Sequence, residues 1–454
     1  MSIIKKIFSS FKNIHFQSLI GNGVMAGFGM LTVAILYRAL SFKDIGIYIF
    51  FTTILALIDT LRSGFLTNSF IKFYSGTAID RANEVSGSGW ALGIAITLFS
   101  IALNIPSYFL SSLITNEGMI LFLKYFSLIS IATLPSFMAN LVVQGDKRFD
   151  RLLWMRLINQ VLFTGTIIVL VIIKQSSLNA VLITYVLSNL LSSIIILLLG
   201  WSKIGTLKYS SKTAFMELFH FGKYSMATSV SANLFHVTDT FFINFYLGPA
   251  ALAIYNLSGK LLQIIEMPLL SFAASGMPSL SAHYNNGKKA EMMYVMKKMV
   301  GMLSIVILVV ALCSVAFANP IIALIGGEKY LTTEAPNLFR ILMCMAVLYP
   351  ADRFFSLGVD VIHLPKINFY KILVMLAANL IGDFVGVAIF HSIYGIAIAN
   401  ILPIIIAIWI TYKPLNNYYN FNFWSVFTVG FNEIIVFLKH IYSTFFFKSK
   451  NVNH

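Results

Sequence analysis

The sequence predicts an all-α integral membrane protein with about 12 transmembrane helices in two six-helix bundles. First, 58% of the 454 residues are hydrophobic and only 11% are charged, a composition that soluble globular domains do not reach. Second, apolar stretches of about 20 residues, the length that crosses a hydrocarbon core of about 30 Å, recur along the chain. Third, the two halves share a repeated pattern. Only short polar loops remain between the stretches, so a separate catalytic domain is not expected.

Six spans are predicted in each half of the chain. In the first half they lie near residues 16–37, 45–66, 90–110, 119–141, 152–173 and 178–199. In the second half they lie near 221–247, 250–274, 299–318, 337–357, 368–390 and 393–410. We therefore expect five segments: a cytoplasmic amphipathic N-terminus (1–15), an N-terminal bundle (16–199), a cytoplasmic connector (200–220), a C-terminal bundle (221–410) and a cytoplasmic or interfacial tail (411–454).

The two ends of the chain need separate interpretations. The basic N-terminus has no apolar run that ends in a small-residue cleavage site, so we expect it to be retained and not removed as a signal peptide. The tail is rich in aromatic residues between 421 and 447 and carries Glu433, Lys439 and His440 there. This pattern favours a helix lying on the cytoplasmic surface. Two further weak spans are the alternative.

The distribution of basic residues predicts the orientation. The formal net charge is +15, which by itself would also fit a nucleic-acid-binding protein. With the N-terminus inside, however, 23 Lys and Arg residues fall in the inside loops and tails, and four fall outside: Arg38, Lys43, Lys174 and Lys329. Excess Lys and Arg in cytoplasmic loops is a topology signal. Both termini are therefore expected in the cytoplasm, with no nucleic-acid partner.

An internal repeat relates the two halves. Residues 40–48 (LSFKDIGIY) align with residues 247–255 (LGPAALAIY) at an offset of 207, and the same offset places Ile58 and Asp59 on Ile265 and Glu266. Six spans precede the second copy, so both copies run in the same direction across the membrane. Parallel repeats of this kind predict two bundles that rock about a central binding site.

Cations inside the spans are the first group of candidate site residues. An ionised group in the hydrocarbon core costs several kcal/mol, so it is retained where something polar must pass. Five basic residues remain once those assigned to loops and tails are set aside: Arg62, Lys124, Lys260, Arg340 and Arg353. We expect them to hold an anionic head group, above all a phosphate or pyrophosphate. For Lys124 and Arg340, which lie near span ends, snorkelling to the head groups is the alternative.

Acids inside the spans are the second group. They are Asp59, Asp239, Glu266, Asp352 and Asp383, and His236 lies three residues before Asp239. Buried carboxylates bind Na⁺ or carry protons, so these residues are candidates for ion coupling. The alternatives are structural: Asp59 with Arg62 and Asp352 with Arg353 as simple ion pairs, and His236 as a hydrogen-bonded residue. The two cysteines form no CxxC pair and the eight histidines are scattered, so no resident metal is expected.

Three sequence stretches resemble a known family. Residues 246–281 (YLGPAALAIYNLSGKLLQIIEMPLLSFAASGMPSLS), 38–51 (RALSFKDIGIYIFF) and 394–402 (YGIAIANIL) are similar to the repeat motifs and twelfth-span motif of the polysaccharide flippases in the MATE-like (MOP) exporter superfamily. The resemblance covers roughly residues 16–410 and is nearest to the Wzx-type O-antigen flippases.

The resemblance implies two six-helix bundles in a V around a central cavity. It also implies a flippase of the bacterial inner membrane that moves an oligosaccharide on undecaprenyl pyrophosphate, an O-antigen or capsule repeat unit, to the outer leaflet by alternating access. Lys260 and Arg62 are the positions carried over to the cavity. No catalytic residue or cofactor is implied, and H⁺ or Na⁺ would supply the coupling. The expected partners are the lipid-linked oligosaccharide, membrane lipids, and the polymerase and chain-length regulator of the same pathway.

Two other functions stay open at this point. A multidrug or cation antiporter of the same superfamily would favour an acidic pocket, and the five intramembrane acids fit it. A polytopic O-antigen polymerase would need a large outside loop for its active site. The longest outside stretch here is about 319–336, with Glu328, Lys329 and Glu334 as its charged residues, which disfavours the enzyme.

Overall fold

The computed structural model describes residues 14–109 and 114–447, apart from a few side chains within them. The predicted N-terminal segment 1–15 lies almost wholly outside these residues. The described residues form helices and no strand, which confirms the all-α prediction. Ten of the helices are long and apolar enough to cross a membrane, and two shorter apolar stretches, Met25–Ala39 and Ser425–Val436, accompany them.

The six spans predicted for the first half correspond to six helices. These are α2 (Ile14–Ala39), α3 (Phe42–Tyr74), α4 (Ile79–Phe109), α5 (Glu117–Gly145), α6 (Phe149–Ile172) and α7 (Leu178–Leu198). The connector contains the short helix η2 (Ile204–Tyr209), and α8 (Lys212–Phe242) and the π-helical turn η3 (Ile243–Leu247) follow it.

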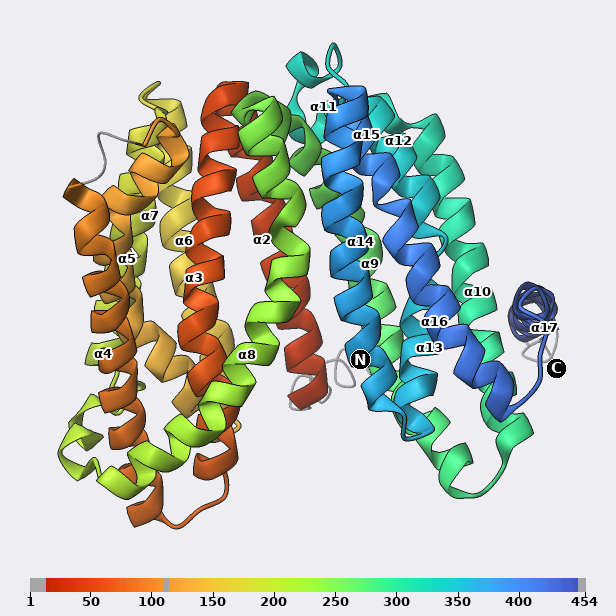
Figure 1. Cartoon of the computed structure of the whole chain (residues 1–454), viewed down its shortest axis with the longest axis horizontal. Helices are drawn as coiled ribbons and strands as arrows, with labels where there is room; N and C mark the ends of the chain where they lie inside the picture. Colours follow the sequence, from red (N-terminus) through yellow and green to blue (C-terminus); the bar gives the residue numbers. More distant parts are fainter. Residues whose placement is uncertain (1–13, 110–113, 448–454) are drawn as a thin grey trace, which may run out of the picture. The chain divides into compact units, whose positions relative to one another are not determined.

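Contacts divide the chain into two compact units, and α8 belongs to the first. That unit comprises residues 1–244 and 248–253, whereas the sequence placed the division at the connector 200–220. The reason is the packing of α8 along α3 (Figure 1). A Cβ at Gly222 would collide with the backbone of Phe65, and one at Gly64 would lie 2.9 Å from the Met226 Cα. Small residues at these two places let the helices approach closely.

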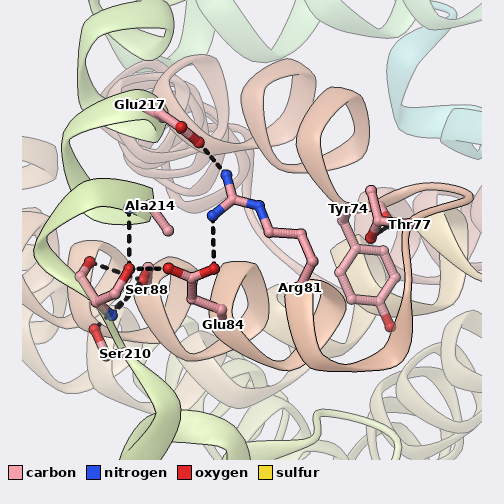
Figure 2. A network of polar contacts seen from close by, with 9 residues as sticks. Tyr74, Thr77, Arg81, Glu84, Ser88, Ser210, Ala214 and Glu217 are labelled. Carbon is pink, nitrogen blue, oxygen red and sulfur yellow. Dashed lines mark hydrogen bonds and ion pairs between the residues drawn. The ribbon is translucent and has the colours of Figure 1, made fainter.

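The connector also packs on the first unit. The Trp90 indole on α4 donates to the Ser202 carbonyl at 2.8 Å, and Thr206 on η2 bonds Ser86 at 3.0 Å. Figure 2 shows a second link, in which the Arg81 guanidinium bridges the carboxylates of Glu84 on α4 and Glu217 on α8. These contacts hold the start of α8 against α4.

The second unit contains the rest of the chain. Its helices are α9 (Pro249–Asn285), whose first turn belongs to the first unit, α10 (Lys289–Ala316), α11 (Ala318–Gly326), η4 (Glu328–Tyr330), α12 (Ala335–Ala346), α13 (Tyr349–Val361), α14 (Pro365–Phe390), α15 (Ile393–Ala399), α16 (Ile401–Tyr418) and α17 (Ser425–Phe447). Two predicted spans are interrupted: 337–357 is divided between α12 and α13, and 393–410 is divided between α15 and α16 at Asn400.

The repeat is visible in where helices begin. α3 starts at Phe42 and α9 at Pro249, which is the same offset of 207 (249 − 42) found in the sequence. Ser41 caps α3 by accepting from the Asp44 N–H, while Gly248 precedes α9 with φ of +88°, a conformation that favours glycine. Equivalent positions in the two halves therefore start equivalent helices.

The tail forms one long helix across the second unit. In Figure 1, α17 is seen end-on beside α10, which runs along the plane of the view. The helices meet where a Cβ on Gly430 would collide with the Gly301 backbone. Glu433 of α17 forms an ion pair with Lys298 of α10 and accepts from the Tyr294 hydroxyl. In this view α17 runs across α10 (Figure 1), and the surface-helix interpretation of the tail stays a prediction.

Candidate functional site

A polar cavity lies within the first unit. Its volume is about 230 Å³, and α3, α4, α5 and α7 supply its walls. More than half of the lining side chains are polar or charged: Thr52, Asp59, Arg62, Thr97, Ser100, Ser130, Thr133 and Tyr185. A cavity with this lining between apolar helices is suited to a polar group, because buried polar atoms need hydrogen-bond partners.

Arg62 is the buried cation of this cavity. The residue is 6% exposed, and its guanidinium lies 2.6 Å from the Asp59 carboxylate. It donates to the Thr133 hydroxyl at 2.9 Å and to the Ser130 carbonyl at 3.1 Å, and its Cζ lies 4.7 Å from the centre of the Phe137 ring. The guanidinium is therefore fixed in position before any ligand arrives.

The local sequence explains this arrangement. Asp59 and Arg62 are three residues apart on α3, so they share one helix face. On α5, Pro135 lies inside the helix close to Ser130 and Thr133, and a proline interrupts the helical hydrogen bonds at such a place. Arg62 binds α5 in this region. The Arg62 Nε has no hydrogen-bond partner among the described atoms, so one N–H donor of the guanidinium remains available to a ligand.

Asp59 has a different environment from Arg62. Its side chain is 45% exposed and lines the cavity, while the Arg62 side chain is 7% exposed. The cavity thus pairs a buried, fixed cation with an accessible carboxylate. An anion that replaced the Asp59 carboxylate would meet guanidinium N–H groups that are already oriented. The planar guanidinium of Arg is well matched to phosphate and carboxylate oxygens.

The other predicted cations are divided between the two units. Lys124 on α5 is exposed and its Nζ lies 5.3 Å from the centre of the Tyr125 ring. In the second unit, Lys260 is half-buried on α9 and Arg353 is exposed on α13. The structure therefore does not gather the five cations within one unit.

Arg340 has a structural environment. Its guanidinium on α12 donates to the Val315 carbonyl at 3.2 Å and to the side-chain oxygens of Asn337 and Asn319 at 2.6 and 3.1 Å. It thereby joins the end of α10 to the start of α11. The substrate contact predicted for Arg340 stays a prediction.

The structural alternative for Asp352, an ion pair with Arg353, is not the pairing that the structure shows. Asp352 lies 2.9 Å from Lys371 on α14, not against its neighbour Arg353, because consecutive residues on a helix point in different directions. Lys371 is 7% exposed and also donates to the Ser356 hydroxyl at 2.6 Å. The topology count treated Lys371 as a loop residue although it falls inside the predicted span 368–390. Its position in that span was the signal that could have identified it.

Asp383 lies one helical turn from a hydrogen-bonded chain of polar residues that the sequence did not reveal, and together they are called the Asp383 cluster. It is 0% exposed on α14, one turn after Asn379. The Asn379 amide donates to Asn400 at 3.0 Å, and the Asn400 amide donates to the Tyr255 hydroxyl at 2.8 Å. Asn400 stands at the break between α15 and α16, so the polar groups meet at an interrupted helix.

No group of three or more Asp, Glu, His and Cys residues that could hold a metal ion occurs in the described chain.

The remaining acids are more dispersed. Asp239 lies near the end of α8 in the first unit, and Glu266 is half-buried on α9 in the second. The His236 side chain lies outside the described ones, so the expected pairing of His236 with Asp239 stays a prediction.

Long apolar helices with ionised side chains buried between them define a multi-pass membrane protein of a transporter fold. The chain belongs to the polysaccharide biosynthesis protein family, whose sequence model matches residues 35–335, more than half of the chain. The search of curated proteins finds no match.

Solved structures identify the fold. A lipid II flippase MurJ in an inward closed conformation is similar with a TM-score of 0.71 at 16% identity, covering 94% of this chain and 92% of its own. An inward-facing multidrug resistance MATE family transporter of the MOP superfamily gives 0.68 at 15%, covering 87% and 95%. A MOP superfamily transporter from Pyrococcus furiosus gives 0.59 at 15%, covering 88% and 93%. The predicted MATE-like fold class is thus confirmed.

Proposed function

We propose that this protein is a flippase of a lipid-linked oligosaccharide. It would move an O-antigen or capsule repeat unit on undecaprenyl pyrophosphate from the cytoplasmic to the outer leaflet of a bacterial inner membrane, by alternating access. Membership of the polysaccharide biosynthesis family supports the substrate class. The observation that carries the proposal is the buried, preoriented guanidinium of Arg62 at a polar cavity.

Arg62 would bind the pyrophosphate by exchange of partners. Its guanidinium is held by Ser130 and Thr133 independently of Asp59. A phosphate oxygen can therefore take the place of the carboxylate without moving the cation. Asp59, being 45% exposed at its side chain, is free to swing away or to take a proton. Protonation of Asp59 would release Arg62 for the substrate and would link head-group binding to proton uptake.

Lys260 and Arg353 would act at other stages. Both lie in the second unit and neither forms an ion pair with a described residue. Lys260 lies in the second-half motif (residues 246–281), and we propose that it contacts the head group as alternating access proceeds. The polymerase and chain-length regulator stay predicted partners.

Ion coupling is proposed at the Asp383 cluster. A carboxylate together with the side-chain oxygens of Asn379, Asn400 and Tyr255 is a set of hard oxygen donors, the kind that Na⁺ and similar cations prefer. An interrupted helix at such a site is a frequent feature of ion-coupled transporters. Binding of a cation would reset the transporter, with one charge crossing 100 mV supplying about 2.3 kcal/mol.

A flipping assay tests the proposal. The purified protein is reconstituted in proteoliposomes with a fluorescent undecaprenyl-pyrophosphate oligosaccharide, and the fraction reaching the far leaflet is measured. Arg62→Gln should reduce the rate at least tenfold, because the buried cation is lost while the side chain remains polar. Lys174→Gln, an exposed residue in a loop, is the matched control. Equal rates for Arg62→Gln and the parent would remove Arg62 from the site.

A multidrug or cation antiporter is the second candidate. The accessible Asp59 carboxylate and the buried Asp383 both favour a cation over an anion. Expression in a drug-sensitive strain distinguishes the two functions, since an antiporter raises resistance to cationic drugs and a dedicated flippase does not.

A further inference from the structure

A second pocket lies away from the Arg62 cavity, between the end of α3 and the first three turns of α8. It is an open groove of about 730 Å³ with a mainly apolar floor. Phe73, Phe221 and Met216 form much of that floor, and Lys212 and His220 stand at its edges. All of these residues belong to the first unit. On the orientation that the positive-inside rule gives, the groove faces the cytoplasm.

The groove carries uncompensated positive charge. The Lys72 Nζ lies 4.2 Å from the centre of the Phe221 ring and 5.2 Å from that of Phe73, so it stands directly over the floor. Neither Lys72 nor Lys212 forms an ion pair with a described residue. Glu217 is the acid of the lining, and its carboxylate shares the Arg81 guanidinium with Glu84 (Figure 2), so these three groups leave one negative charge against the two lysines. The net charge available to a ligand is therefore positive.

The groove lies just beyond the predicted cytoplasmic end of the α3 span. The second predicted span ends near Leu66, and Lys72 comes six residues later on the same helix. At 1.5 Å per residue this is a rise of about 9 Å. The polar layer on each side of the hydrocarbon core is roughly 5–8 Å thick. The Lys72 backbone therefore lies at about the outer edge of this layer, and a lysine side chain is long enough to reach back to the head groups.

We propose that this groove binds an anionic phospholipid of the cytoplasmic leaflet. Its phosphate would lie between Lys72 and Lys212, and its first acyl methylenes would lie on Phe73, Phe221 and Met216. A bilayer lipid fits better than the transported pyrophosphate, because both lysines are exposed. Exposed lysines attract an anionic head group without fixing its position. Specific recognition would need a desolvated, fixed donor such as Arg62. The lipid would hold the first turns of α8 at the membrane surface.

Quenching by brominated lipids tests this proposal. Phe221→Trp places a reporter in the groove and keeps the aromatic ring under Lys72, since Trp is the best ring for a cation. The full chain is reconstituted in nanodiscs of phosphatidylcholine with a small fraction of dibrominated phosphatidylglycerol or dibrominated phosphatidylcholine. The signal of the parent without the reporter is subtracted. For the same degree of quenching, the content of brominated phosphatidylglycerol should be about fivefold lower than that of brominated phosphatidylcholine for each participating lysine. This factor is equivalent to about 1 kcal/mol per lysine.

Two variants and one competitor decide the result. Lys72→Gln with Lys212→Gln should abolish the preference for phosphatidylglycerol, whereas Lys366→Gln with Lys413→Gln, two exposed lysines of the second unit, should keep it. Equal quenching by both lipids, or an unchanged preference in the Lys72 and Lys212 variant, would overturn the proposal. Displacement of brominated phosphatidylglycerol by equimolar undecaprenyl pyrophosphate would also overturn it and assign the groove to the substrate. Loss of flipping in Arg62→Gln has no bearing on this outcome.

Discussion

The Arg62 guanidinium lies 2.6 Å from the Asp59 carboxylate, with 7% of the arginine side chain and 45% of the aspartate side chain exposed. This asymmetry distinguishes the pair from a simple structural ion pair. The cation is immobilised by α5 through Ser130 and Thr133, while the anion faces a cavity. One partner is therefore fixed and the other is exchangeable.

A double-mutant cycle measures the strength of this pair. Asp59→Asn leaves a buried guanidinium without its counter-charge, and Arg62→Met removes the cation. We expect each single change to lower the thermal midpoint and the combined change to cost less than the sum, with a coupling of roughly 0.5–3 kcal/mol. Thermal unfolding of the purified protein in detergent gives the three values. Strict additivity would show that the two side chains do not interact.

The Asp352–Lys371 pair should be important for stability. Lys371 is 7% exposed, so Lys371→Met leaves a carboxylate with no cation inside the second unit. The Asp352 side chain is 28% exposed, so we expect the loss to cost about 1.5–3 kcal/mol, the range for hydrogen bonds to charged groups. Arg353→Met, at the exposed neighbouring position, should change stability by less than about 0.5 kcal/mol. Thermal midpoints that fell equally in the two variants would favour the pairing of Asp352 with Arg353.

Sodium should stabilise the protein through Asp383. A ligand that binds the folded state raises stability in proportion to the logarithm of its concentration above Kd. We expect the thermal midpoint to rise with NaCl but not with choline chloride, and this rise should vanish in Asp383→Asn. Asp44→Asn, at the start of α3, is the control. A sodium-dependent rise that persists in Asp383→Asn would place the ion elsewhere.

Docking of α17 on α10 should depend on Gly430. A larger side chain there meets the Gly301 backbone, so Gly430→Leu should separate the helices and make the tail a ready substrate for limited proteolysis. Gly165→Ala has no atom within 4 Å of the new Cβ and should leave the digestion pattern unchanged. Protection of the tail in Gly430→Leu would show that α17 is held by other contacts.

The same helix should respond to acid. The Lys298 ammonium and the Tyr294 hydroxyl hold the pKa of Glu433 below its ordinary value. A carboxyl with a lowered folded-state pKa contributes stability that is complete above the unfolded value of about 4.3 and is lost as the pH falls through the folded value. Protection of the tail should thus be constant from neutral pH down to about 5 and fall below about 4. Glu433→Gln should remove that acid step, and an unchanged step would assign it to another carboxyl.

Hydrophobicity along the chain was sufficient to locate the spans. Most predicted spans coincide with described helices, and the offset of 207 between the halves recurs in the starts of α3 and α9. Arg62 and Asp383 were both identified as candidates from their positions within apolar segments. The sequence did not identify Asn379, Asn400 and Tyr255. Placing a neutral polar residue in a span costs little free energy, so such a residue gives no signal until its hydrogen-bond partners are known.

The sequence by itself determined that this is a multi-pass helical membrane protein of the polysaccharide biosynthesis family. Crossing a bilayer depends on the length and apolarity of one contiguous segment, and both can be determined from that segment of the sequence alone. Only the tertiary structure decided that α8 packs with the first unit, that Asp352 pairs with Lys371, and that Asn400 joins α14 at an interrupted helix. Those outcomes depend on which helix faces meet, and residues far apart in the chain settle that together.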